Sequence, residues 1–139
     1  MNQTAIFTPF LSMMLLTIVV WFYMYAKRIT FIQKSKLNPN QVTAAELARI
    51  SPPAVSNPSD NLKNLFEIPT LFYAAMLYLY VTNKVDETYL IAAWVFVALR
   101  ALHSAIHCTV NIVIVRFWLY CISTLALWFM VIRAAIAAL

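Results

Sequence analysis

Glycine is absent from this chain of 139 residues. The phosphate-binding loops and dinucleotide-binding turns that depend on glycine are therefore excluded. Tight β-turns and barrels also rely on glycine, whereas helices tolerate its absence. The missing residue thus favours a helical protein, and favours helical spans over a barrel in a membrane.

Charged residues are also scarce. They make up 11% of the sequence and hydrophobic residues 63%, whereas a soluble domain carries about 25% charged residues. Lipid is therefore the expected solvent for most of the chain. The net charge is +5, but six of the ten cations lie between Lys27 and Lys63, which is typical of a cytoplasmic loop and argues against a nucleic-acid partner. The two cysteines, Cys108 and Cys121, lie in apolar segments and are interpreted as buried small side chains, not as a disulfide.

Four apolar stretches approach the length of about 20 residues that a membrane helix needs. The first, from Ala5 to Ala26, has no charge and is followed directly by Lys27 and Arg28. This order is the reverse of a signal peptide's and puts the N-terminus outside the cytoplasm. The sequence predicts one all-α domain over residues 1–139, an integral membrane four-helix bundle with both termini on the outer (periplasmic) side. The predicted spans are about 5–26, 62–82, 88–111 and 116–136, with a cytoplasmic loop over 27–61.

Prolines are expected to shape the loop and the second span. Four of them should interrupt any continuous helix in the loop. They are Pro39, Pro52, Pro53 and Pro58. Thr43 is expected to cap a short helix that ends near Arg49. The second span is expected to start near Asp60 and to kink at Pro69.

The third span carries a stripe of polar residues. Arg100, His103, His107 and Asn111 follow one another at helical spacing. On a regular helix they fall within an arc of about 80°. Because an ionised group in the membrane centre costs at least about 2.5 kcal/mol unless it faces protein or water, the stripe predicts a polar interior seam. The small residues beside it predict close helix packing there.

The second span offers a complementary face. Asp60, Asn64 and Glu67 share one side of the predicted helix, and Lys63 lies one position off it. Glu67 is the one acid within a predicted span, and pairing with Arg100 is the expected way to lower the cost of both charges. Such a pair would serve equally well to fasten the two helices together or to hold a ligand.

Two further interpretations remain open at this point. Arg116 fits a snorkelling anchor at the membrane boundary as well as a site residue, and Tyr120 fits an interface aromatic. His103 and His107 share a helix face, as metal ligands do. They lack a third ligand and lie next to the cation Arg100, so no metal site is expected.

Two blocks of residues together resemble the MAPEG family, the membrane-associated proteins in eicosanoid and glutathione metabolism. The first is the run Lys63-Asn64-Leu65-Phe66-Glu67-Ile68-Pro69. The second is Arg100-Ala101-Leu102-His103-Ser104-Ala105-Ile106-His107, followed by Arg116 and Tyr120. The likeness covers nearly the whole chain, including its length, its four spans and its long first loop.

The resemblance implies a homotrimer that binds glutathione between neighbouring protomers, near the cytoplasmic side. Asn64 and Glu67 would hold the glutathione backbone, and Arg116 and Tyr120 would lie near the sulfur. The implied catalytic residues are Arg116 and Tyr120, and the implied glutathione-binding residues are Arg28, Lys63, Asn64, Glu67, Arg100, His103 and His107.

The chain departs from the family pattern at four positions. Asp60 and Lys63 stand where the resemblance leads one to expect arginine, and His107 stands where tyrosine is usual. Phe117 replaces a serine of the prostaglandin synthase branch. The last change argues against the prostaglandin isomerase reaction.

The resulting expectation is a bacterial-type member in the inner membrane that conjugates glutathione, or a related thiol, to a lipophilic electrophile or uses it to reduce a peroxide. A different class of function is a non-catalytic helix bundle that binds a lipid or a partner subunit in the polar seam. A metal-dependent enzyme using His103 and His107 is the third alternative.

Overall fold

The computed structural model describes residues 2–139, which are helical apart from short connections and contain no strand. The helices are η1 (Gln3–Ile6), α1 (Phe7–Lys34), α2 (Ala44–Ile50), α3 (Pro53–Leu65), α4 (Ile68–Val81), α5 (Glu87–Cys108) and α6 (Val113–Ile136). Four helical stretches are long and apolar enough to cross a membrane: Gln3–Lys34, Pro53–Val81, Glu87–Cys108 and Val113–Ile136. The prediction of an all-α protein with four spans is confirmed.

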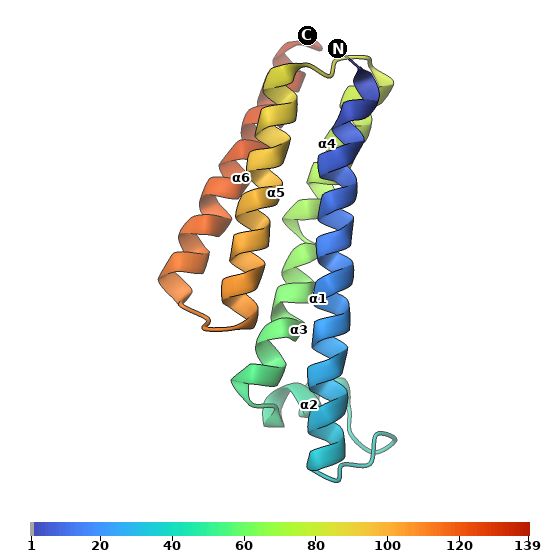
Figure 1. The fold of residues 1–139 in the computed structure, drawn as a ribbon, viewed down its shortest axis with the longest axis vertical. Helices are drawn as coiled ribbons and strands as arrows, with labels where there is room; N and C mark the ends of the chain where they lie inside the picture. Colours follow the sequence, from blue (N-terminus) through green and yellow to red (C-terminus); the bar gives the residue numbers. More distant parts are fainter. Residues whose placement is uncertain (1) are drawn as a thin grey trace.

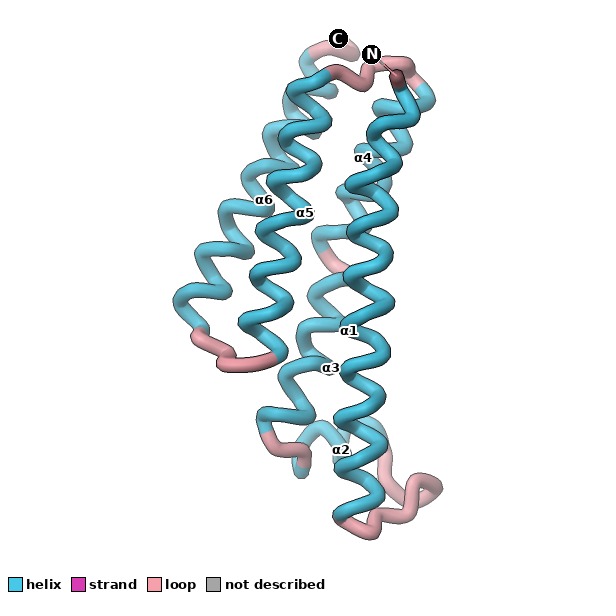
Figure 2. Tube along the Cα trace, viewed as in Figure 1, coloured by secondary structure: helices cyan, strands magenta, loops and turns pink. Residues whose placement is uncertain are grey.

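The spans form one elongated bundle (Figure 1). Helices α5 and α6 make a tightly packed antiparallel hairpin, and α1 packs against both α3 and α5. Both chain ends lie at one end of the bundle, and α2 with its flanking loops lies at the other (Figure 2). The loop-rich end therefore carries α2 and the connection from α1, while the opposite end carries the termini.

The proline prediction for the loop is partly wrong. Helix α3 begins at Pro53 and contains Pro58, so the second span starts well before Asp60. Pro53 is suited to the first helical turn, where its missing N–H would have no partner. Pro58 does remove one helical hydrogen bond, but the carbonyl that it leaves free belongs to Ala54, which is exposed. By contrast, the predicted Thr43 cap is confirmed, since Thr43 Oγ1 accepts from Glu46 N at 3.2 Å.

The predicted kink at Pro69 is confirmed, and the helix is interrupted there instead of only bent. Helix α3 ends at Leu65 and α4 begins at Ile68, with Glu67 in a non-helical conformation between them (φ −93°, ψ −103°). The hydroxyl of Thr70 donates to the Glu67 carbonyl at 2.6 Å. Because the break falls at Glu67 itself, this side chain does not continue the face defined by Asn64.

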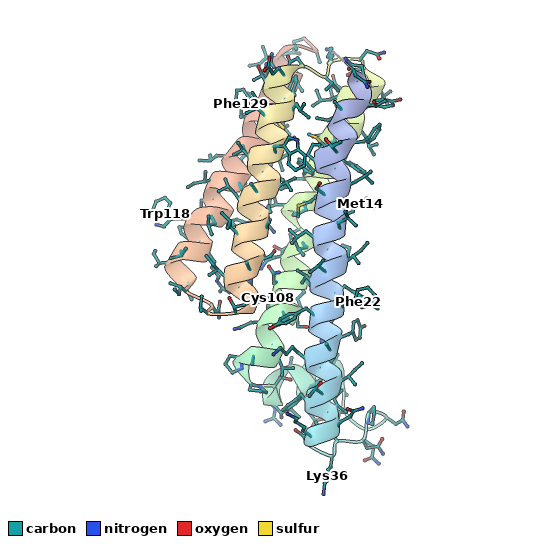
Figure 3. The ribbon with its side chains drawn as sticks, in the orientation of Figure 1. Met14, Phe22, Lys36, Cys108, Trp118 and Phe129 are labelled. Carbon is teal, nitrogen blue, oxygen red and sulfur yellow. The ribbon has the colours of Figure 1, made fainter. Side chains whose placement is uncertain are left out.

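The apolar core fills the half of the bundle nearer the termini. Phe72 of α4 and Phe96 of α5 are fully buried, and their rings stack at a centroid distance of 4.5 Å. On the outside, large apolar side chains such as Phe22 of α1 and Trp118 of α6 point away from the bundle (Figure 3). This apolar exterior is what a lipid-facing surface requires.

Three side-chain interactions fasten both termini to the α4–α5 connection. The Gln3 amide donates to Val85 O and accepts from Val85 N, at 3.1 and 2.9 Å. Lys84 Nζ donates to Ala137 O at 2.9 Å. Arg133 of α6 contacts both carboxylate oxygens of Asp86, the N-cap of α5, at 2.9 and 2.7 Å.

The Asp86–Arg133 pair leads to a pH-dependent prediction. The hydrogen bond from Arg133 lowers the pKa of Asp86 below its ordinary value. The pair therefore stabilises the protein above the ordinary carboxyl pKa, and this contribution is lost as the pH falls through the lowered value. Asp86→Asn keeps a good N-cap and removes the charge, so its thermal midpoint should fall below wild type at pH 7. The difference should shrink as the pH is lowered below the ordinary carboxyl pKa; a constant difference at all pH values would contradict the assignment.

Candidate functional site

A buried polar cluster lies where α3, α5 and α6 meet, on the side of the bundle that carries α2. Its centre is Arg100 of α5, which is fully buried. Arg100 Nη2 donates to the backbone carbonyl of Asn64 at 2.9 Å. The other two guanidinium nitrogens, Nε and Nη1, are buried without a hydrogen-bond partner in residues 2–139. A buried cation with two free donors is costly, and it is suited to an anionic group that residues 2–139 do not supply.

The predicted ion pair between Glu67 and Arg100 is wrong. Glu67 is exposed at the break between α3 and α4, and the part of the chain that the structure describes has only two ion pairs, Lys63–Asp60 and Arg133–Asp86. The cause is the Pro69 break, because the regular helix α3 ends at Leu65, one residue after Asn64. The main-chain oxygen of Asn64 takes the place that was expected for the carboxylate.

Aromatic and imidazole rings surround Arg100. Its guanidinium carbon lies 5.3 Å from the ring centroid of Tyr120. Tyr120 belongs to α6, and its ring centroid is 6.0 Å from that of His103. His103 Nδ1 lies 2.9 Å from the carbonyl of Arg116, which joins α5 to the first turn of α6. The two predicted catalytic residues, Arg116 and Tyr120, thus lie next to the polar stripe of α5.

His107 lies on the same stripe, with its ring 5.6 Å from that of His103. Both histidines are buried, and His103 Nε2 and His107 Nδ1 have no hydrogen-bond partner among the described residues. No group of three metal-ligating side chains is found in residues 2–139. The imidazoles therefore add two more polar atoms without partners to the same cluster.

Asn111 does not lie on the helix stripe, and this prediction is wrong. Helix α5 ends at Cys108, and Asn111 adopts a left-handed conformation with φ of 49°. Its backbone N–H donates to Ile106 O at 2.7 Å, which closes the end of the helix. Its side chain then bridges two elements: Oδ1 accepts from Arg116 Nη1 at 2.8 Å and Nδ2 donates to Asn57 Oδ1 at 3.2 Å. Asn111 therefore orients the Arg116 guanidinium.

Three predicted site residues lie outside the cluster. Lys63 is exposed and pairs with Asp60 at 3.2 Å. Arg28 Nη2 donates to Ser59 Oγ at 2.8 Å, between α1 and α3. Together with the exposed Glu67, they present polar groups to the exterior of the loop-side half.

The sequence reasoning missed Asn61, the most deeply buried amide of α3. Asn61 is fully buried, its Oδ1 accepts from Ser104 Oγ at 3.3 Å, and its Nδ2 donates to Cys108 Sγ at 3.5 Å. A signal was present, because Val55, Pro58, Asn61 and Leu65 follow helical spacing and are all buried. Once α3 is extended back to Pro53, that stripe identifies Asn61 as the polar contact with the small residues of α5.

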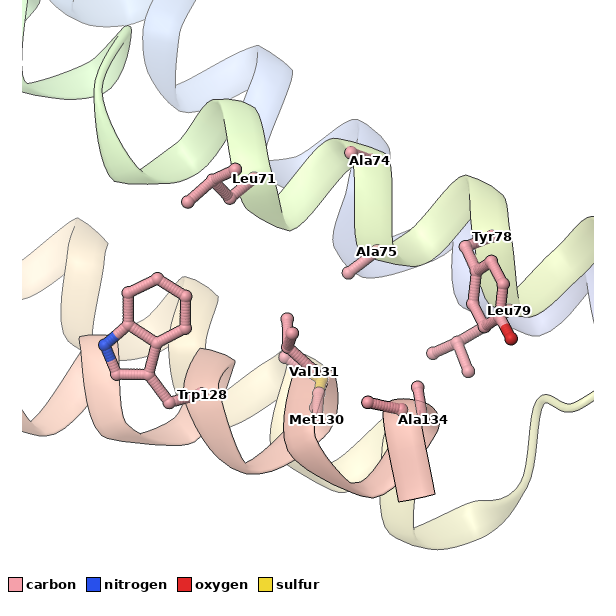
Figure 4. A pocket seen from close by; sticks show the side chains of 10 residues that line it. Leu71, Ala74, Ala75, Tyr78, Leu79, Trp128, Met130, Val131 and Ala134 are labelled. Atoms are coloured by element: carbon pink, nitrogen blue, oxygen red, sulfur yellow. The ribbon is translucent and has the colours of Figure 1, made fainter. Parts of the chain in front are cut away.

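An apolar groove opens between α4 and α6 on the side nearer the termini (Figure 4). Its volume is about 440 Å³, and its walls include Leu71 and Ala75 of α4 and Trp128 and Val131 of α6. Trp128 follows Tyr120 by eight residues of helix, or about 12 Å. The groove is thus a separate, apolar feature that begins about two turns from the polar cluster.

Comparison with known proteins gives one positive result. No match was found among curated proteins or among solved structures. The model of the MAPEG family matches residues 6–136, which include every helix that contributes to the polar cluster. The protein thus belongs to the MAPEG family.

Proposed function

We propose that this protein binds glutathione, or a related thiol, within the membrane and transfers it to a lipophilic electrophile or uses it to reduce a lipophilic peroxide. The observation that carries the proposal is Arg100, a fully buried guanidinium with two unpartnered nitrogens. An anionic ligand would satisfy both donors. Glutathione has two carboxylates for such donors, and membership of the MAPEG family supports this class of ligand.

The proposed binding roles follow the chemistry of the tripeptide. Arg100 would bind a carboxylate, and His103 and His107 would add hydrogen bonds from nitrogens that have no partner in the free protomer. Asn64 would hold the peptide backbone, and Glu67 would face the amino group. Lys63 and Arg28 would supply further positive charge at the entrance, since both lie near the loop-side end.

The proposed chemistry needs a thiolate. A free cysteine thiol has a pKa of about 8.5, and a neighbouring cation lowers it. Arg116 remains charged and can hold the thiolate without giving up a proton, while the hydroxyl of Tyr120 can donate to the sulfur. The thiol proton leaves to solvent, the sulfur forms a bond to the electrophilic carbon, and the leaving group departs with its electron pair.

We also infer a homotrimer in which the site is completed by a neighbouring protomer. The positions of Glu67, Lys63 and Arg28 support this arrangement. Glu67 and Lys63 are exposed and Arg28 is half-buried against Ser59, and within residues 2–139 none of the three forms a hydrogen bond to Arg100. The loop side would face the cytoplasm, as the excess of cations there supports. Both termini would then be periplasmic and the protein would lie in a bacterial inner membrane.

The apolar groove between α4 and α6 is our candidate for the lipophilic partner. It faces the acyl chains of the bilayer and is lined almost entirely by apolar side chains. A substrate held there would need no passage through water. The thiolate at Arg116 would approach it from the loop side.

The proposal is tested by calorimetry of glutathione on the purified protein. Wild type should bind with a Kd of millimolar or tighter, and Arg116→Ala should weaken binding by about 10- to 150-fold, since a hydrogen bond to a charged group contributes about 1.5–3 kcal/mol. Asn111→Gly is the matched control. It breaks the same Arg116–Asn111 contact at a left-handed position but keeps the cation, so its Kd should change by less than about fivefold.

The outcome that contradicts the proposal is equally specific. If wild type binds no glutathione at 10 millimolar, and Arg116→Ala only lowers the thermal midpoint, the cluster is a structural seam. The protein would then be a non-catalytic helix bundle. Glutathione binding that persists unchanged in Arg116→Ala would remove Arg116 from the site.

A further inference from the structure

One face of α1 lines two separate pockets. Leu16, Val20 and Tyr23 border a pocket between α1 and α5, and Lys27 and Lys34 border a second pocket at the loop-side end. At 100° per residue, these five positions fall within an arc of about 60°. The two pockets therefore follow one another along a single furrow. Its α5 wall includes Ser104 and Cys108, but it contains neither Arg100 and its ring neighbours nor any residue of the α4–α6 groove.

The upper part of the furrow is apolar. Its pocket has a volume of about 260 Å³ and combines Leu16, Val19 and Tyr23 of α1 with the small side chains of Ala101 and Ala105 of α5. The small residues leave room beside the bulkier α1 side chains. The shape and chemistry are those of a site for a hydrocarbon chain.

The lower part of the furrow is cationic. Its pocket has a volume of about 430 Å³ and is lined by Lys27, Thr30 and Lys34, with Phe31 beside them. No carboxylate lines it, and neither lysine forms an ion pair within residues 2–139. Lys27 Nζ instead lies 5.3 Å from the ring centroid of Tyr23, at the junction of the two parts. Helical side chains lean toward the N-terminus of their helix, so Lys34 leans back toward Lys27.

The dimensions match one leaflet of a bilayer. From Leu16 to Lys27 the helix axis rises about 16 Å, close to half of the roughly 30 Å hydrocarbon core. Lys27 directly follows the uncharged run that ends at Ala26, so it lies at the level of the headgroups. The apolar part then faces acyl chains and the cationic part faces phosphate.

We propose that α1 binds an anionic phospholipid along this furrow, with an acyl chain between α1 and α5 and the phosphate between Lys27 and Lys34. The charges favour this occupant over a second copy of the chain. Of its five acids, Asp60 and Asp86 are already paired and Glu87 lies at the opposite end. Two exposed carboxylates remain, Glu46 and Glu67, and the proposed function already assigns Glu67 to glutathione. A second copy would thus offer one unassigned carboxylate, Glu46, to two lysines. A free phosphate would leave the apolar part of the furrow empty.

The test is a lipid titration of the purified full chain, followed by native mass spectrometry. Phosphatidylglycerol and phosphatidylcholine with identical acyl chains are the two probes. A lysine near an anionic surface contributes about fivefold to binding, so Lys27→Gln/Lys34→Gln should lower the affinity for phosphatidylglycerol by about 25-fold. Its affinity for phosphatidylcholine should stay within twofold of wild type. The matched control is Lys36→Gln/Arg49→Gln, which removes two exposed cations from the same end but outside the furrow.

Three results of these titrations would overturn the proposal. Equal binding of the two lipids would mean that the lysines do not recognise the headgroup charge. An equal loss in both double variants would mean that total charge and not the furrow recruits lipid. Displacement of phosphatidylglycerol by millimolar inorganic phosphate would identify a site for a free anion. Ala105→Phe should fill the apolar part and abolish lipid binding with both lysines present. If it changes the oligomeric mass instead, the furrow is an interface between copies.

Discussion

Replacing Arg100 by methionine should make the ligand-free protein more stable and abolish glutathione binding. We expect the free energy of unfolding to rise by about 1–4 kcal/mol, because apolar replacement of a buried charged group is often neutral or stabilising by that amount. In the same variant, glutathione binding should weaken by at least about 100-fold, the loss of a charge-assisted pair in a buried site. Opposite changes in stability and affinity would identify Arg100 as a binding residue.

The structure explains why stability should rise. Arg100 is fully buried and makes one hydrogen bond, to the carbonyl of Asn64. That carbonyl also accepts from the backbone N–H of Glu67 at 3.4 Å, so it keeps a partner when the guanidinium is removed. Methionine is flexible and polarizable enough to fill the space beside Tyr120. Two unpartnered polar nitrogens disappear, and no ion pair is broken, since Arg100 forms none within residues 2–139.

The measurement is reversible unfolding in detergent, with and without glutathione, beside a matched variant. Arg133→Met makes the same substitution in a cation that does pair with a carboxylate, Asp86. It should lower or leave unchanged the thermal midpoint and should not affect glutathione binding, since it lies at the opposite end of the bundle. A lower stability of Arg100→Met would show instead that Arg100 fastens α5 to α3.

Most of the fold could be predicted from hydropathy alone. Four predominantly apolar stretches can only be satisfied as helices in lipid, and the cations between Lys27 and Lys63 mark the loop side. The helix ends were harder to predict. Helix α1 continues to Lys34, beyond its apolar run, and α3 begins at Pro53, because polar helical turns outside the bilayer leave no trace in hydropathy.

The candidate site could be predicted only as far as regular helices extend. Arg100, His103 and His107 share one helix, and their common stripe is found buried as expected. The two errors both fall where a helix stops. Glu67 turns outward at the break before Pro69, and Asn111 leaves the stripe after Cys108. Helical spacing carries no information across such ends, since the next residues no longer rotate by a fixed angle.

Asn61→Asp should be the most destabilising single change in the seam. Asn61 is fully buried against Ser104 and Cys108, and its side-chain hydrogen bonds within residues 2–139 go to these two neutral groups. At pH 8 an aspartate there would be an uncompensated buried charge, which costs about 3–5 kcal/mol. The new oxygen would also take the place of the amide donor to Cys108 Sγ. Chemical unfolding in detergent should show the loss directly.

Asn57→Asp provides the matched control, because it makes the same substitution one helical turn earlier. Asn57 is half-buried and already accepts from Asn111, whose other contact is Arg116. A carboxylate at this position has a donor and a nearby cation, so its cost should be below about 1 kcal/mol. Equal destabilisation by the two variants would mean that α3 tolerates no charge on this face. A large cost confined to Asn61 would show that a neutral amide holds α3 against α5, and so fixes the Asn64 carbonyl over Arg100.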